Sequence, residues 1–186
     1  MRKIIGAALI FLALCSLLGL ALFRYQKPKC ALENLILQDD MMPSEWERLW
    51  RVLPPALPTD GATDALEVDY ESGNNRASQT IYQYKNEFLA FFFLRFNDQV
   101  LFPTAWIKWT NLNGSESWDL NGNENRIRCG ESQYPIIGYK CSAVVRYGQF
   151  ISQFSTPIIE GKMSAEQFKS IVLAIDDQIS TCINKP

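Results

Sequence analysis

The sequence predicts an α+β domain, an antiparallel β-sheet with packed helices that include an amphipathic C-terminal helix, preceded by one N-terminal transmembrane helix. Three observations predict this class. Residues 4–23 form an apolar run without charge, short segments between residues 66 and 156 alternate apolar and polar side chains, and residues 164–182 carry apolar side chains at helical spacing. The chain beyond residue 29 is about 157 residues long, which suits one domain with a sizeable core, so we expect one anchor, residues 1–29, and one domain, residues 30–186.

The apolar run lies between Arg2-Lys3 and a basic stub, residues 24–29. About 20 residues at 1.5 Å each span roughly 30 Å, the hydrocarbon thickness of a bilayer, so we expect an uncleaved signal anchor. Two alternatives stay open: a cleaved signal peptide, because residues 19–21 offer small side chains, and a lipoprotein signal at Cys15. Basic residues flank both ends, so the flanking charges do not orient the segment.

The next elements are a helix and a pair of strands. Residues 31–37 form a short apolar segment, and Pro43 stands a few residues later. Proline pushes the residue before it out of helical geometry. Ser44 is therefore placed to cap a short helix over residues 45–52. Prolines then open a loop through residue 63. Residues 66–71 alternate apolar and acidic side chains and predict a strand with one face on a core and one in water, and a turn at residues 73–75 leads to a second strand over residues 78–84.

A phenylalanine-rich segment, residues 88–96, follows Asn86 and Glu87. An asparagine cap and an acidic first turn favour a helix here. The three consecutive phenylalanines fall on different faces of such a helix, so a fully buried strand is the alternative. If the helix is not fully enclosed, its exposed side becomes an apolar surface suited to a partner or to the adjacent bilayer.

Strands and one long helix account for the rest of the chain. We expect short strands over residues 105–110, 118–120 and 126–129, and two stronger strands over residues 139–146 and 149–156, joined by a hairpin at Tyr147-Gly148. Ser164 and Gln167 form a capping box for the terminal helix. Its apolar stripe leaves Asp177 in water and Asp176 at the edge of the stripe.

One segment carries a family resemblance. Leu35, Leu37, Asp40-Met41, Pro43 and Trp46 are spaced in a way that resembles the L-x-x-x-D-L-P-x-G-W opening of many bacterial secreted or lipid-anchored proteins, some with a Mog1/PsbP-like fold. Here Glu45 stands where that opening has glycine. The resemblance implies an α-β-α layered domain that acts in ligand sensing or as an accessory subunit, and it implies no catalytic residue.

Charge and cysteines place the domain. Residues 1–29 hold five of the 18 basic and none of the 20 acidic residues, so the remaining chain carries a net charge of −7, which disfavours nucleic acid as a partner. Beyond Cys15 the chain has an even set of four cysteines, and in an extracytoplasmic domain the default interpretation is two disulfides. We favour a Cys129–Cys141 pair, which flanks a Gly/Pro-containing stretch between two strands, and hence a Cys30–Cys182 pair.

The residue types exclude most catalytic designs. The chain contains no histidine, which removes Ser-His-Asp and Cys-His arrangements and histidine-based metal sites, and it has no C-x-x-C spacing for zinc. The acid pairs Asp39-Asp40 and Asp176-Asp177 do not form dyads, because adjacent side chains on a strand or helix point apart. Asp119 begins a segment that resembles a calcium loop, but Glu124 occupies the glycine position, so we expect a solvated turn.

Two further groups of residues are weighed as sites. Lys140 and Ser142 share one strand face, a weak basis for a Ser-Lys nucleophile, since such residues are ordinary on a wet strand face. An acidic stretch predicts a solvated edge or a surface that faces a cation or a partner, and it comprises Asp60, Asp64, Glu67, Asp69 and Glu71.

We therefore expect a bacterial, membrane-tethered extracytoplasmic domain that binds a protein partner or a small ligand, with no catalytic residues, no cofactor and no metal. One alternative is a carboxylate-dependent hydrolase of cell-envelope material, which requires a cleft with two convergent acids about 5–10 Å apart. The other is a structural subunit of a membrane complex, with its phenylalanine-rich helix buried against another protein.

Overall fold

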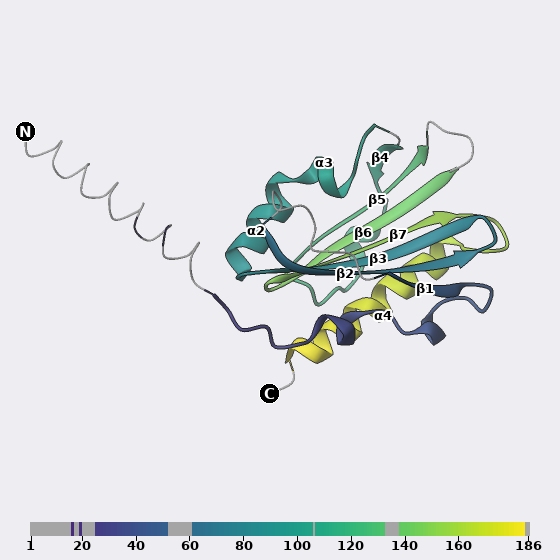
Figure 1. Cartoon of the computed structure of the whole chain (residues 1–186). Coiled ribbons are helices and arrows are strands. Elements are labelled where there is room, and N and C mark those ends of the chain that lie inside the picture. Colours follow the sequence, from purple (N-terminus) through teal and green to yellow (C-terminus); the bar gives the residue numbers. More distant parts are fainter. Residues whose placement is uncertain are drawn as a thin grey trace, which may run out of the picture.

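The computed structural model describes residues 16, 19, 25–51, 61–105, 107–132 and 138–184. Within these residues seven strands form one antiparallel sheet in the order β1-β2-β3-β7-β6-β5-β4, with helices packed on it, so the predicted α+β class is confirmed (Figure 1). The predicted membrane segment, residues 4–23, lies outside the described residues apart from Ser16 and Gly19. No helix in the described ranges has the length and hydropathy needed to cross a membrane.

The strands are β1 (Glu47–Arg51), β2 (Ala62–Ser72), β3 (Asn75–Tyr84), β4 (Ile107–Asn111), β5 (Glu124–Ser132), β6 (Tyr139–Tyr147) and β7 (Phe150–Ile158). The α-helices are α2 (Glu87–Phe96), α3 (Asp98–Leu101) and α4 (Ala165–Asn184). Three 3-10 turns are η1 (Leu32–Leu35), η2 (Asp39–Met41) and η4 (Ser115–Ser117).

Several predicted elements are confirmed in place. β2 and β3 form the first hairpin, and β6 and β7 form the second around the two-residue turn Gly148-Gln149. Gly148 has φ +56°, in the left-handed region that a tight hairpin turn needs and glycine adopts without strain. Asn86 caps α2 by accepting a hydrogen bond from the Leu89 N–H (2.9 Å), so the phenylalanine-rich segment is the helix and not the alternative buried strand.

Two predicted elements are wrong. The helix expected over residues 45–52 is instead the edge strand β1, which pairs with β2 so that Leu49 faces Asp69. A partner strand that arrives later in the chain supplies β1 with backbone hydrogen bonds, which a local capping signal at Ser44 cannot anticipate. The strand expected over residues 118–120 is a loop that leaves η4.

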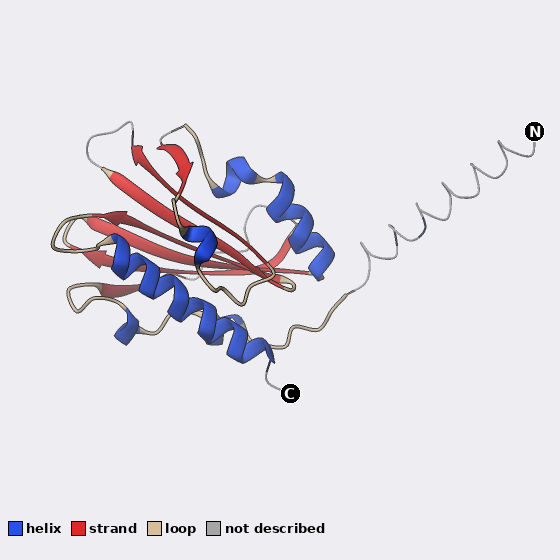
Figure 2. Ribbon diagram, turned by 180° about the vertical axis from the view of Figure 1, so that it is seen from behind, coloured by secondary structure: helices blue, strands red, loops and turns tan. Residues whose placement is uncertain are grey.

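One face of the sheet is covered by α4 (Figure 2). The predicted capping box is present: the Gln167 N–H donates to Ser164 Oγ (3.1 Å), and the Ser164 N–H donates to Gln167 Oε1 (2.8 Å). The stripe predicted for this helix is buried against the sheet and comprises Phe168, Ile171, Val172, Ile175 and Ile179. Leu35, Leu37 and Trp46 of the L-x-L…W segment are buried in the same core.

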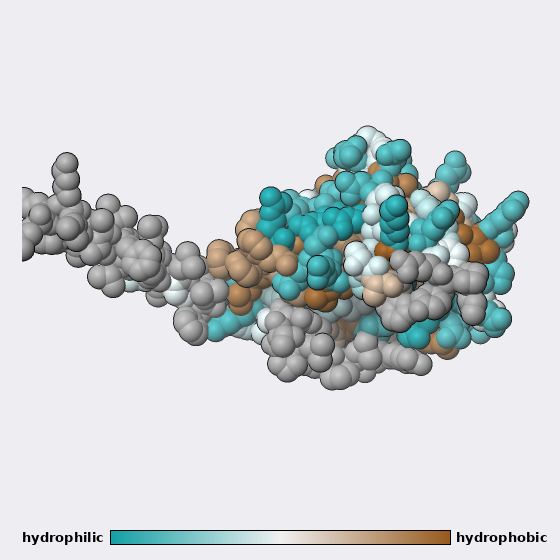
Figure 3. All heavy atoms as spheres, turned by 90° about the horizontal axis from the view of Figure 1, so that it is seen from above, coloured by the Kyte–Doolittle hydropathy of each residue, from teal (hydrophilic) through white to brown (hydrophobic). Residues whose placement is uncertain are grey.

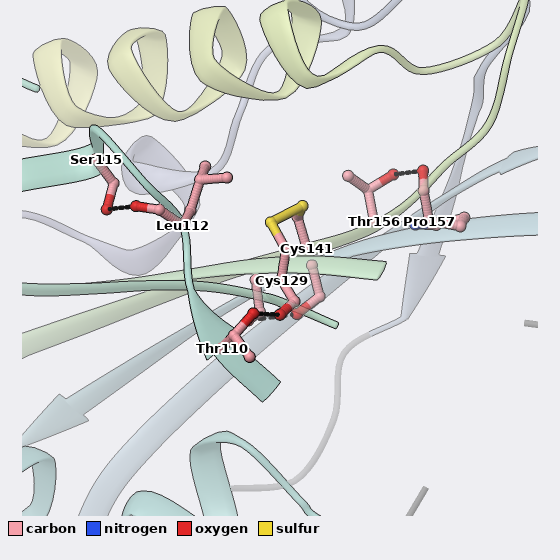
Figure 4. The surroundings of a disulfide bond; sticks show 9 residues. Thr110, Leu112, Ser115, Cys129, Cys141, Thr156 and Pro157 are labelled. Carbon is pink, nitrogen blue, oxygen red and sulfur yellow. Dashed lines mark hydrogen bonds between the residues drawn. A yellow bond between two sulfur atoms is a disulfide. The ribbon is translucent and has the colours of Figure 1, made fainter. Parts of the chain in front are cut away.

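Two disulfides join parts of this core, with the connectivity favoured from the sequence. Cys129 and Cys141 lie directly opposite each other on β5 and β6, and Figure 4 shows their bond on the α4 side of these strands. Cys30 pairs with Cys182 near the end of α4, across a sequence separation of 152 residues. In the chain-entropy model a 12-residue separation contributes about 3 kcal/mol and the long closure about 5 kcal/mol. The second bond fixes the start of the domain to its last helix.

The opposite face of the sheet is only partly covered. A smaller core forms where α2 and α3 pack on it, and it comprises Tyr84, Ala90, Phe93, Leu94, Leu101, Phe102, Val144 and Ile151. Figure 1 shows these two short helices over one end of the sheet, with β3, β6 and β7 continuing beyond them. Among the described residues, no helix covers the remainder of this face.

A buried carboxylate ties α4 to the rest of the domain. Asp176, predicted at the edge of the apolar stripe, is 1 % exposed. It accepts hydrogen bonds from the Asn121 N–H and side-chain amide (both 2.8 Å), the Gly122 N–H (3.2 Å) and the Tyr147 hydroxyl (2.9 Å). Burial and the neighbouring carboxylate raise the pKa of Tyr147, which keeps this hydroxyl a donor. Asn121 of the calcium-like segment thus serves to anchor a loop.

We expect Asp176→Asn to destabilise the domain by about 2–4 kcal/mol, because hydrogen bonds to a charged group contribute about 1.5–3 kcal/mol each and the new amide would face donors. Urea unfolding followed by circular dichroism measures the loss. The matched control is Asp177→Asn, one residue away and exposed, which should change stability by no more than about 0.5 kcal/mol. Equal effects of the two substitutions would contradict the assigned role of Asp176.

Candidate functional site

A pocket of about 310 Å³ lies on the partly covered sheet face, beside α3. Its floor consists of side chains from β2, β3, β6 and β7: Glu67, Ser78, Thr80, Lys140, Gln153 and Ser155. Its wall consists of Val100, Leu101, Pro103, Ile107 and Trp109, from α3, the following loop and β4. We call this the sheet pocket. A polar floor beside an apolar wall is the usual composition of a small-molecule site.

The floor is polar because of strand alternation. In β2, Leu66, Val68 and Tyr70 face the α4 core, so Glu67 and Asp69 between them face the pocket side. The same alternation in β3, β6 and β7 turns hydroxyl, amide and ammonium groups to this side. A strand slip of one residue would exchange the two sets, so the register that buries the core also builds the floor.

The floor is hollow because small side chains line up across the sheet. Ser78 of β3 is registered opposite Ser155 of β7, and Ser155 is registered opposite Ser142 of β6. The Ser155 hydroxyl donates to Ser142 Oγ (2.8 Å). Ser78 and Ser155 line the pocket, where larger side chains would fill the space beside α3, and Ser142 lies beneath Ser155 as the third member of the row. We call these three residues the serine row.

Charged groups at one end of the floor are balanced. Arg76 forms an ion pair with Asp69, whose side chain is fully buried, and lies 4.0 Å from Glu67. Burial, followed by the charge of Asp69, raises the pKa of Glu67, although Arg76 opposes the shift. Burial, followed by the charge of Arg76, lowers the pKa of Lys140, and Glu67 opposes that shift. Two cations and two carboxylates thus meet at this end.

Ion pairs position the wall. Asp98 at the start of α3 accepts hydrogen bonds from Arg126 (2.7 Å) and Arg128 (2.6 Å), both on β5. Burial alone would raise the pKa of Asp98, but the two guanidinium groups hold this pKa below its ordinary value. At the other end of α3 the Gln153 side-chain amide donates to the Leu101 carbonyl (2.9 Å), which joins the floor to the wall.

The indole of Trp109 has a fixed orientation. Its Nε1–H donates to the Pro103 carbonyl (3.1 Å), and its ring meets the Phe102 ring edge-on with centroids 5.5 Å apart. Phe102 is itself covered by the Arg128 guanidinium, 4.5 Å from the ring centroid. Trp109 remains half-buried, so part of its ring faces the pocket.

The structure separates the side chains weighed from the sequence. Lys140 and Ser142 share a strand face, as predicted, but Ser142 is fully buried under Ser155 and Gln153, so no substrate reaches this hydroxyl. Asp39 is exposed and pairs with Arg48, away from the sheet pocket. Asp119 is exposed, and no group of three potential metal-ligating acids, cysteines or histidines lies together among the described residues.

The acidic stretch behaves differently from its prediction as a solvated edge. Asp64 and Glu71 are exposed, whereas Glu67 is part of the sheet pocket and Asp69 is sealed by Arg76. Asp60 lies outside the described residues. Sequence reasoning also missed the serine row and Gln153. In the sequence these residues are visible as polar side chains that alternate with apolar ones along three strands. Only the pairing register shows that the polar side chains of different strands lie next to one another.

No protein-family model matches this chain, and no curated protein matches it. Among solved structures the fold is similar to the extracellular domain of PknH from Mycobacterium tuberculosis, with a TM-score of 0.56 and 12 % sequence identity over 83 % of this chain and 98 % of that one. At this identity the likeness shows the fold alone. The Mog1/PsbP resemblance thus has no family match, but the fold does occur in an extracellular bacterial domain.

We expect Lys140→Met to stabilise the domain at pH 7. The lowered pKa of Lys140 means that folding disfavours its charged form. The free-energy cost of burying the charged ammonium group is fully present below the folded-state pKa of Lys140. It disappears as the pH rises from that pKa to the ordinary pKa of lysine. The gain in thermal midpoint should therefore shrink toward pH 10–11. Lys108→Met, an exposed lysine on β4, is the control and should give little change at any pH. A gain independent of pH would contradict this explanation.

Proposed function

We propose that this chain is a membrane-tethered extracytoplasmic binding domain without chemistry of its own, and that the sheet pocket binds a small, neutral, polyhydroxylated ligand such as a sugar. The observation that carries the proposal is the pair Ser78 and Ser155 of the serine row, which line the pocket floor beside a fixed indole ring. A sugar presents many hydroxyl groups to such a floor and an apolar C–H face to an aromatic wall.

The charge balance of the pocket favours a neutral ligand. Among the described residues at this end, the two cations Lys140 and Arg76 are equal in number to the two carboxylates Glu67 and Asp69, so the local charges balance. Hydroxyl and amide side chains donate and accept at once, which suits a ligand that does both. The volume, about 310 Å³, lies at the lower end of the range for small-molecule pockets and suits one or two sugar rings.

The disulfides and the N-terminal sequence support the proposed extracytoplasmic, membrane-tethered location. Two disulfides are typical of oxidising, extracytoplasmic compartments, and the fold is shared with the extracellular domain named above. Residues 4–23 have the length and composition of a single membrane span. These observations favour an uncleaved anchor, with a cleaved and secreted form as the alternative.

The hydrolase alternative finds less support. It requires two acids that both reach the substrate. Glu67 and Asp69 are close, since they point to the same side of β2, but Asp69 has no exposed surface and is paired with Arg76. Glu67 alone remains in contact with the pocket. Among the described lining residues, this geometry provides one hydrogen-bonding carboxylate for a ligand and lacks a second accessible one.

Isotope-labelled protein titrated with glucose, N-acetylglucosamine and trehalose tests the ligand class by NMR. We expect saturable shifts centred on the serine row with at least one of these sugars. Ser78→Leu, which fills the pocket, should weaken binding at least tenfold, whereas Ser117→Leu, an exposed residue outside the pocket, should not. Saturation only by charged probes such as glucose 6-phosphate or glutamate, or equal affinity in Ser78→Leu, would sink the proposal.

Cysteine chemistry in intact cells tests the location. We expect Cys182, which is half-buried and bonded to Cys30, to be unreactive toward a membrane-impermeant maleimide until a membrane-impermeant reductant is added, because an extracytoplasmic domain keeps its disulfide and is accessible from outside. A matched serine variant of both cysteines reports the background labelling. If labelling requires permeabilisation and no reductant, the domain faces the cytosol and the proposed location is wrong.

A further inference from the structure

The outer face of α2 is an exposed aromatic surface. Phe91, Phe92 and Phe96 are 41 %, 49 % and 66 % exposed, and Val100 of α3 is 52 % exposed beside them in sequence. Three rings follow one another along the helix: Phe88 and Phe92 are stacked with centroids 6.3 Å apart, and Phe92 and Phe96 are tilted with centroids 4.5 Å apart. Figure 3 shows hydrophobic side chains gathered at one end of the domain. Contiguous exposed apolar surface of this kind marks an interaction site.

The N-terminal chain is fastened to the start of this helix. The Gln26 N–H donates to the Lys85 carbonyl (2.9 Å), and Gln26 Oε1 accepts a hydrogen bond from the Glu87 N–H (2.9 Å), one of the free amides of the first turn of α2. Residues 25–29 therefore pass the base of α2, as Figure 1 shows. These two hydrogen bonds hold Gln26 against the first turn of α2.

This attachment sets a short distance to the predicted membrane span. The apolar run ends at Phe23, three residues before Gln26. A fully extended chain covers at most about 3.6 Å per residue, so Gln26, whose side chain is hydrogen-bonded to the start of α2, lies within roughly 11 Å of the end of the run. If residues 4–23 span a bilayer, the start of α2 is held close to the lipid headgroups.

The charges around the aromatic surface suit a membrane. The domain as a whole is acidic, but Lys27, Lys29 and Arg95 are exposed near this end, and the Arg146 guanidinium lies 5.7 Å from the centre of the Phe91 ring. Glu87 is also exposed here, and Arg95 lies 3.8 Å from Glu124. An apolar helix face beside basic side chains is the composition of an interfacial membrane helix.

We propose that α2 docks on the membrane surface, with Phe92 and Phe96 inserted among the lipid headgroups. This inference rests on the proposed tether. Gln26 and the short stub determine which end of the domain meets the lipid, and the aromatic side chains supply the contact. Because α3 continues from α2 and forms the pocket wall, docking also holds the sheet pocket in one orientation near the membrane.

The test uses the full chain in vesicles of phosphatidylcholine and phosphatidylglycerol in which part of the phosphatidylcholine carries bromine on its acyl chains. Phe92→Trp and, separately, Phe96→Trp place a fluorophore on the aromatic surface. Tyr139→Trp is the matched control, since Tyr139 is also an exposed aromatic residue (42 %) but lies at the opposite end of β6 from the hairpin that packs near Glu87. Eight residues of strand separate these ends by roughly 26 Å.

We expect bromine to quench the added tryptophan at 92 or 96 at least threefold more than the one at 139, after subtraction of the wild-type signal. Vesicle flotation of the same samples reports the tether separately. If the protein floats and quenching is equal at positions 92, 96 and 139, the docking proposal is wrong and the tether is unaffected. A protein partner would then be the occupant to test for α2. Protein that does not float overturns the tether, and the docking with it. Unchanged thermal unfolding of the variants confirms that they fold.

Discussion

The packing of α4 on one face of the seven-stranded sheet is the interaction on which the other features of this domain depend. The helix contributes a five-residue apolar stripe to the larger core, and Asp176 on the same helix accepts hydrogen bonds from a loop and from the Tyr147 hydroxyl at the end of β6. A buried carboxylate is tolerated there because each of its oxygens has donors. The Cys30–Cys182 bond then fastens the start of the domain to the end of this helix.

Once α4 has taken one face, the other face is left with two short helices. They cover its apolar end, around Tyr84, Val144 and Ile151, and among the described residues no helix covers the polar end. Charged residues are stable in that half-open setting only because they are matched: Arg76 with Asp69, and Asp98 with two arginines. The pocket is therefore a consequence of incomplete coverage, and its neutrality is a consequence of the pairing that burial requires.

The likeness to the extracellular domain of PknH concerns the arrangement of strands and helices and not the residues of a site. Functional arguments for this chain consequently rest on its own side chains. The serine row and Trp109 argue for a polyhydroxylated ligand, and the phenylalanine face of α2 beside Gln26 argues for contact with lipid. Both surfaces belong to the face that α4 does not cover, with α2 and α3 between the proposed membrane contact and the pocket.

Local patterns in the sequence determined the elements whose signals lie within a few residues. The capping box at Ser164, the cap at Asn86, the hairpin at Gly148 and the even cysteine set all predicted features that the structure contains. These signals act through neighbouring backbone groups or through a small number of possible pairings, so no distant information is needed.

Only the tertiary structure decided where residues far apart in the sequence meet. Residues 47–51 became a strand because β2 offers them an edge, and Asp176 became buried because a loop 55 residues earlier supplies its donors. Ser78 and Ser155 line one pocket floor, with Ser142 beneath Ser155, only through the register of three strands. Strand register depends on the packing of the whole sheet, so the sequence shows which side chains alternate but not which of them become neighbours.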